Sequence, residues 1–151
     1  MEKHFAVSGF VMNPEKNKLL MVHHKKLNKW VIPGGHLEEN EFPFAGARRE
    51  IMEETGVTAK VLDCSGFSVS STKKETQIPN PMMTLQELIP AKGDKPEHIH
   101  IDLIFLCEAE EGKVKGQEDE VNDVKWMSIW DVAEADTFDS IKAFAKFMIG
   151  A

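Results

Sequence analysis

The segment GGHLEENEFPFAGARREIMEETGV, residues 34–57, carries the pattern that determines the fold: two glycines and a turn lead into an acidic helix. Pro43 suits the first turn of a helix, where its missing N–H costs nothing. Gly56 suits the position just past the last turn, where a left-handed backbone ends the helix. The spacing therefore predicts a helix from Pro43 to about Thr55.

Three carboxylates near the end of this predicted helix share one face. Glu50, Glu53 and Glu54 stand at positions i, i+3 and i+4, which lie together on a helix surface. Like charges at that spacing destabilise a helix by ~0.2–0.5 kcal/mol per pair, and the helix dipole disfavours anions at its C-terminal end. A bound cation would remove both penalties, and oxygen ligands in this number suit Mg²⁺ or Mn²⁺.

The residues around these carboxylates fit the same hypothesis. Arg49 is four residues before Glu53 and could orient its carboxylate, while Glu41 could accept a hydrogen bond from Arg49 or from the loop backbone. Gly34 and Gly35 allow the loop backbone to approach the helix or a ligand closely. The alternative is a solvated acidic helix face after a turn, and for Glu53 and Glu54 taken alone that is the commoner situation.

The complete segment resembles the Nudix box, which reads Gly, five residues, Glu, seven residues, then Arg-Glu-apolar-x-Glu-Glu-x-Gly-apolar. Every defined position is matched, by Gly35, Glu41, Arg49, Glu50, Ile51, Glu53, Glu54, Gly56 and Val57. The start of the helix, residues 42–46, is more apolar than usual. Gly46 within it weakens the helix by ~1 kcal/mol relative to alanine.

This resemblance implies hydrolysis of a nucleoside diphosphate linked to another group, with Mg²⁺ or Mn²⁺ as cofactor. By the same resemblance, Arg49 and Glu41 form an orienting pair. The implied metal ligands are the three helix carboxylates and the Gly35 carbonyl oxygen, namely Glu50, Glu53, Glu54 and Gly35.

The general base differs between members of that family. Glu53 or Glu54 is one choice, and an acid on a later loop is the other. Glu120, six residues before Trp126, best fits the later acid. The acidic run at 118–120 could equally be a solvated turn, so both explanations stay open.

The remaining sequence predicts a single α/β domain over residues 1–151, a Nudix-type α/β/α sandwich with a mixed sheet. Alternation and turn residues predict strands at 5–12, 19–23, 30–32, 59–70, 84–89, 98–108 and 124–129. Helical turns are predicted at 130–135 and 140–149, and the apolar stripe of the second is expected to pack on the sheet.

Composition limits the possible partners. The formal net charge is −7 and no long Lys/Arg cluster occurs, which argues against binding duplex nucleic acid. No stretch approaches the ~20 apolar residues of a membrane span, and no secretory signal is visible. Cys64 and Cys107 are expected to be buried free thiols in a reducing compartment, so we expect a cytoplasmic protein.

The substrate is less well determined. His98, His100 and Asp102 alternate along a predicted strand, so they share one face that would suit a pocket wall or an outer polar surface. Trp30 and His23 could contact a base, although such residues more often belong to the core or the surface.

Several Nudix subfamilies have markers downstream of the box, and the markers of the ADP-ribose, diadenosine polyphosphate, NADH and coenzyme A groups are missing here. By elimination, we expect a nucleoside triphosphate, oxidised or not, to be converted to monophosphate and pyrophosphate. The alternatives are a hydrolase of a nucleotide sugar or dinucleotide, or a non-catalytic nucleotide-binding module. Homodimerisation, which is common in that family, is also expected.

Overall fold

The fold is described from a computed structural model, which covers residues 1–111 and 121–150. In chain order the elements are β1 (Lys3–Met12), β2 (Lys18–His24), β3 (Lys29–Val31), β4 (Gly34–His36), α1 (Pro43–Thr55), β5 (Thr58–Val61), β6 (Met83–Ile89), β7 (His98–Glu111), β8 (Val121–Ser128), α2 (Ile129–Glu134) and α3 (Asp139–Gly150).

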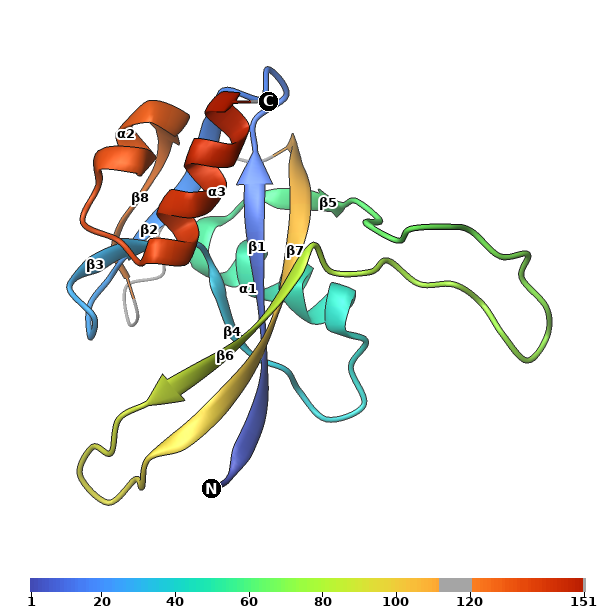
Figure 1. The fold of residues 1–151 in the computed structure, drawn as a ribbon, viewed down its shortest axis with the longest axis horizontal. Coiled ribbons are helices and arrows are strands. Elements are labelled where there is room, and N and C mark those ends of the chain that lie inside the picture. The colour runs from blue at the N-terminus through green and yellow to red at the C-terminus, as the bar shows by residue number, and fades with distance from the viewer. Residues whose placement is uncertain (112–120, 151) are drawn as a thin grey trace.

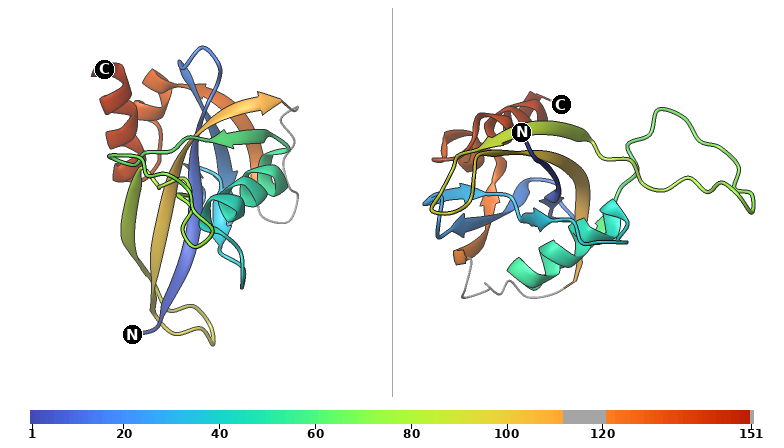
Figure 2. Two further views of the ribbon diagram at one scale, coloured as in Figure 1. Left: turned by 90° about the vertical axis from the view of Figure 1, so that its right-hand side faces the viewer. Right: turned by 90° about the horizontal axis from the view of Figure 1, so that it is seen from below.

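The strands form one mixed sheet with the order β3-β2-β1-β7-β5. β1 and β7 run parallel at its centre, in register from Lys3 opposite Ile99 to Met12 opposite Glu108. The other strands add in antiparallel fashion: β4 pairs with β1, β6 with β7 and β8 with β2. Helix α1 covers one side of the sheet, and α2 with α3 covers the other (Figures 1 and 2). The expected α/β/α sandwich is confirmed.

Successive residues of β1 anchor the two helical layers, because neighbouring strand side chains point to opposite faces. Gly9 faces α1, and a Cβ added there would lie 2.7 Å from Cδ1 of Ile51 and 3.3 Å from Sγ of Cys107. Phe10 faces α3 and stacks on Phe144 with ring centroids 3.9 Å apart. A glycine on one face and a phenylalanine on the other therefore set how closely each helix approaches the sheet.

Helix α1 begins and ends where the sequence predicts. Pro43 stands in its first turn, and Gly56 caps its last turn with a φ of 78°, a left-handed conformation that glycine adopts without strain. The Gly56 N–H donates to the Met52 carbonyl. These two residues place the carboxylates of α1 at defined positions beside β4.

Two local expectations are wrong. The strand expected at 59–70 ends at Val61, because the Asp63 carboxylate accepts hydrogen bonds from the backbone N–H groups of Ser65 and Asn80 and turns the chain out of the sheet. The chain then extends away from the domain (green in Figure 1) before it returns as β6. β4 is an additional strand at Gly34–His36, where the sequence predicted a glycine loop.

The cysteines differ from each other. Cys107 is fully buried, and burial raises the pKa of its thiol to about 12. Cys64 is only half-buried and lies outside the strands, so the expectation of a buried strand residue is wrong there. Among the described residues, no helix is both long and apolar enough to cross a membrane.

The contact between Gly9 and α1 generates a stability prediction. Gly9→Ala should lower the free energy of unfolding by about 1–3 kcal/mol, because the added methyl group overlaps Cδ1 of Ile51. Ile51→Val removes that atom at a cost of about 0.5–1.5 kcal/mol on its own. Urea denaturation of both single variants and the double variant should show that the double variant loses less stability than the two single losses added together. Additive losses would contradict the proposed contact.

Candidate active site

Arg49 is the centre of a charged network at the junction of β4, the following loop and α1. Its Nε and Nη2 donate to the two carboxylate oxygens of Glu41, at 2.8 and 3.1 Å. Nη1 donates to Glu50 at 2.8 Å and to Glu53 at 3.3 Å. Nη2 also donates to the His36 carbonyl oxygen at 3.0 Å. One guanidinium group therefore joins three carboxylates and the end of β4.

The pairing of Arg49 with Glu41 uses the bidentate geometry that a planar guanidinium makes with a carboxylate. The hydrogen bonds from Arg49 hold the pKa of Glu41 below its usual value, and those bonds in turn raise the pKa of Arg49. The side chains are 22% and 15% exposed, so this is a largely buried pair. The contact is the one expected from sequence, whereas the orienting role of the two residues stays a prediction.

Gly35 and Glu50 are in such close contact that any side chain in place of the glycine would displace the Glu50 carboxylate. A Cβ on Gly35 would lie 2.5 Å from the carboxyl carbon of Glu50 and 2.6 and 2.7 Å from its two oxygens. Glu50 itself is buried, with 9% of its surface exposed. The missing side chain leaves a cradle in which the backbone of β4 and a buried carboxylate meet.

Glu54 makes a second link between α1 and β4. Its carboxylate accepts a hydrogen bond of 2.8 Å from the Gly34 N–H, and only 2% of the residue is exposed. Glu53, by contrast, has a side chain that is 49% exposed. The three carboxylates therefore differ in their access to solvent.

The structure explains why α1 contains Gly46. A Cβ at this position would lie 2.8 Å from Oε1 of Glu41 and 2.9 Å from Cδ1 of Leu37. The glycine costs helix propensity, but it leaves the space in which Glu41 reaches Arg49. Gly46, which weakens the helix, is therefore part of the Arg49 network.

The donor set fits a hard divalent cation. Glu50 and Glu53 share Arg49, and the cradle at Gly35 brings backbone beside the Glu50 carboxylate. Carboxylate and carbonyl oxygens are the ligands that Mg²⁺ and Mn²⁺ prefer. Glu120, the other acid considered as a base, lies outside the described residues.

The residues expected to bind substrate form two separate groups. His98, His100 and Asp102 share one face of β7, as expected, and Asp102 is buried and accepts a 2.7 Å hydrogen bond from the Ser8 hydroxyl. Burial, and next the neighbouring Asp102 carboxylate, raises the pKa of Glu87 on β6.

His23 and Trp30 lie opposite each other on β2 and β3 instead. Their ring centroids are 5.2 Å apart, and Nζ of Lys125 lies 4.6 Å from the Trp30 ring centroid. Their contact with substrate stays a prediction, as does that of the group on β7.

Two histidines that the sequence did not single out join the group on β7. His4 is opposite His100 in the β1–β7 register, and the His36 ring centroid lies 4.9 Å from that of His100. Burial, and next the neighbouring imidazoles, lowers the pKa of His100 to about 4. The alternation of polar residues along 98–102 indicates His98 and His100 in the sequence. His4 and His36 join them only through the pairing of strands that are distant in the sequence.

Known proteins resemble this chain in both sequence and fold. The family model described as the NUDIX domain matches residues 2–147. The chain belongs to the NUDIX family. Nudix hydrolase 6 of Arabidopsis thaliana is 30% identical over 131 residues, which are 82% of this chain and 38% of that protein. A MutT-like protein of Streptomyces ambofaciens is 35% identical over 68 residues, 45% of this chain and 44% of that protein.

Among solved structures, a NUDIX family hydrolase from Clostridium perfringens superimposes with a TM-score of 0.75 at 24% identity, covering 99% of this chain and 98% of that one. This similarity supports the fold alone. The chain spans 36% to 44% of the length of three curated relatives that it matches.

The Arg49 network generates a prediction about stability. Arg49→Lys should lower the free energy of unfolding by about 1–3 kcal/mol, because an ammonium group cannot make the bidentate pair and leaves largely buried acceptors without donors. Arg48→Lys is the matched control, since Arg48 Nε makes one hydrogen bond, to the Ala59 carbonyl. Urea denaturation should show a clearly smaller loss in the control; equal losses would contradict a special role for Arg49.

Proposed function

We propose that this protein hydrolyses a phosphoanhydride linkage in a nucleoside diphosphate derivative, with Mg²⁺ or Mn²⁺ as cofactor. The observation that carries the proposal is the set of carboxylates that Arg49 holds against the end of β4. Three acids on one helix turn repel one another, and a nucleotide-binding module without catalysis has no need of them. Membership of the NUDIX family supports the same reaction class.

The cofactor would be held by Glu50, Glu53 and Glu54 together with the Gly35 carbonyl oxygen. When bound, it would neutralise the diphosphate charge and lower the pKa of the attacking water. Arg49 holds the Glu50 and Glu53 carboxylates by hydrogen bonds, and Glu41 keeps Arg49 in place. The chain's own contribution is thus a fixed arrangement of charges that requires little rearrangement when substrate arrives.

Among the described residues, Glu53 is our choice for the general base. A base must reach the water from which it takes a proton. The Glu53 side chain is about half exposed, whereas Glu54 is 2% exposed and accepts a hydrogen bond from Gly34. Glu120 remains the alternative from sequence.

For the substrate, we propose a nucleoside triphosphate, oxidised or not, that yields monophosphate and pyrophosphate. A hydrolase of nucleotide sugars or dinucleotides is the second candidate. A UDP-X diphosphatase has a similar fold, with a TM-score of 0.64 at 17% identity over 99% of this chain and 64% of that one, a likeness that supports the fold alone. We also propose that the protein forms a homodimer, which the family resemblance supports. A cytoplasmic location, which the composition supports, is part of the same proposal.

Loss of a carboxylate should abolish most of the activity. Glu53→Gln should lower kcat by at least about 100-fold in the presence of Mg²⁺, the scale of a lost general base, while circular dichroism and the melting temperature stay close to those of the native protein. The assay is phosphate release with Mg²⁺ and Mn²⁺ in turn. Pyrophosphatase is added for the nucleoside triphosphates, which yield pyrophosphate, and alkaline phosphatase for the dinucleotides and nucleotide sugars, which yield phosphate monoesters.

Glu134→Gln provides the control, since it removes the same charge from an exposed position on α2. Full activity of the Glu53 variant would remove this residue from the mechanism. Absence of turnover in the native protein with every substrate and both metals would favour the non-catalytic module instead.

The cradle at Gly35 provides a test of the cofactor site. Gly35→Ala should raise the Mg²⁺ concentration needed for half-maximal activity by at least about 10-fold, because the methyl group displaces the Glu50 carboxylate. The matched control is Gly66→Ala, where an added Cβ has nothing within 4 Å. Equal Mg²⁺ dependence in the two variants would show that the Glu50 position does not matter for the cofactor.

A further inference from the structure

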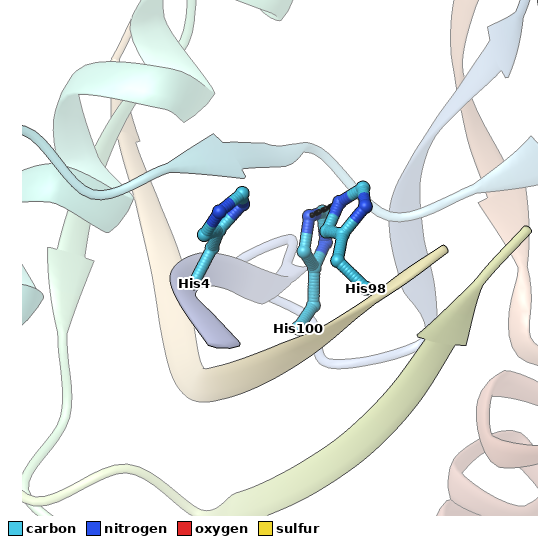
Figure 3. A group of neighbouring side chains, drawn as sticks. All are labelled: His4, His98 and His100. Atoms are coloured by element: carbon cyan, nitrogen blue, oxygen red, sulfur yellow. Dashed lines mark hydrogen bonds between the residues drawn. The ribbon is translucent and has the colours of Figure 1, made fainter. Parts of the chain in front are cut away.

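Three histidines converge at the start of β1 and β7, on the face of the sheet opposite α1 and its carboxylates. His4 and His100 are opposite each other in the parallel register, and His98 is two residues before His100 and therefore on the same face. Figure 3 shows the His98 and His100 rings side by side and joined by a hydrogen bond, with the His4 ring next to them on β1. One ring nitrogen from each lies within 4.8 Å of the others.

The hydrogen bonds of His98 determine which of its nitrogens can bind a ligand. Its Nδ1 lies 3.1 Å from the Pro96 carbonyl oxygen. A carbonyl oxygen only accepts, so Nδ1 carries the proton and Nε2 carries the lone pair. A backbone carbonyl that fixes the tautomer in this way is the usual support of a metal-binding histidine.

The Nε2 atoms of His98 and His100 are 3.2 Å apart. Two imidazole nitrogens bound to one tetrahedral Zn²⁺ at ~2.0–2.1 Å would be separated by about 3.3 Å. In the absence of an ion, the His100 Nε2–H bridges the same gap as a donor to His98. To become ligands the two rings need almost no movement. His100 passes its Nε2 proton through solvent to its own Nδ1, so that Nε2 carries the lone pair.

His4 is supported by an acid. The Glu2 carboxylate lies 2.7 Å from Nε2 of His4, and a carboxylate that accepts from one ring nitrogen leaves the other as a lone-pair donor. Residues Glu2, His4, His36, Lys95, Pro96 and His98 line a cavity of about 250 Å³ beside the cluster, which leaves room for an ion and its water ligands.

We propose that His4, His98 and His100 bind one divalent transition-metal ion, with Zn²⁺ as the ion that fits their geometry best. A water molecule or the neighbouring His36, whose ring centroid is 5.9 Å from that of His4, completes the coordination. Imidazole nitrogens select Zn²⁺ and similar ions, whereas carboxylates select Mg²⁺ and Mn²⁺. The protein thus has two metal sites of different chemistry.

The two sites lie on opposite sides of β4. Gly35 contacts Glu50 of α1, and His36, the next strand residue, points to the other face, toward His100. An ion bound by the histidines would join the first residues of β1 to the start of β7. Because an unfolded chain lacks this arrangement, binding should also stabilise the fold.

The test is a titration of the complete, chelator-treated protein with Co²⁺, followed by its visible absorption and by calorimetry, and then displacement with Zn²⁺. We expect one tight site per chain and a higher melting temperature in its presence. His98→Ala and His100→Ala should each weaken binding by at least about 10-fold. His24→Ala, at the end of β2, provides the matched control and should bind as the native protein does.

Circular dichroism checks that each variant folds, and His98→Ala alone decides the outcome if His100→Ala does not fold. Equal Co²⁺ affinity in the native protein and the folded His98 variant would overturn the proposal. Glu53→Gln separates the two sites, since it should retain Co²⁺ binding at the histidines. Loss of that binding in Glu53→Gln would show that the ion is bound by the carboxylates and would equally overturn the proposal.

Discussion

The hydrogen bonds of Arg49 are the interaction on which the site depends. They connect Glu41 in the loop, Glu50 and Glu53 on α1 and the His36 carbonyl of β4. Without the guanidinium, the carboxylates of Glu41 and Glu50, whose side chains are 15% and 11% exposed, would lack a compensating charge. That loss is far more costly than the loss of a surface ion pair. The arginine therefore makes an acidic site compatible with a stable helix even before a cation is bound.

Three glycines provide the space that this arrangement needs. Gly9 lets α1 approach β1, Gly35 leaves room for the Glu50 carboxylate, and Gly46 leaves room for Glu41. In each case an added Cβ would come closer than 3 Å to an atom of the helix or of the network. The cost in helix propensity at Gly46 is thus local, and the gain is the position of a charged pair.

Local signals in the sequence were sufficient for α1, because a proline and a glycine mark its two ends and the charges between them identify one face. Local signals did not predict the elements and contacts that depend on the pairing of distant segments. β4 is three residues long, and its partner is β1, so no alternation reveals it. His4 joins His100 through the parallel register of β1 and β7, which no local pattern contains. Asp63 ended β5 early through hydrogen bonds to residues on both sides of a long loop.

The most direct measurement of the central claim is a crystal structure of the protein with Mn²⁺ and a non-hydrolysable nucleotide, with an anomalous difference map to locate the metal. The account predicts a peak coordinated by carboxylate oxygens of Glu50, Glu53 and Glu54 and by the Gly35 carbonyl oxygen, with Arg49 still paired with Glu41. A crystal in which Mn²⁺ contacts the nucleotide phosphates but none of these carboxylates would contradict it.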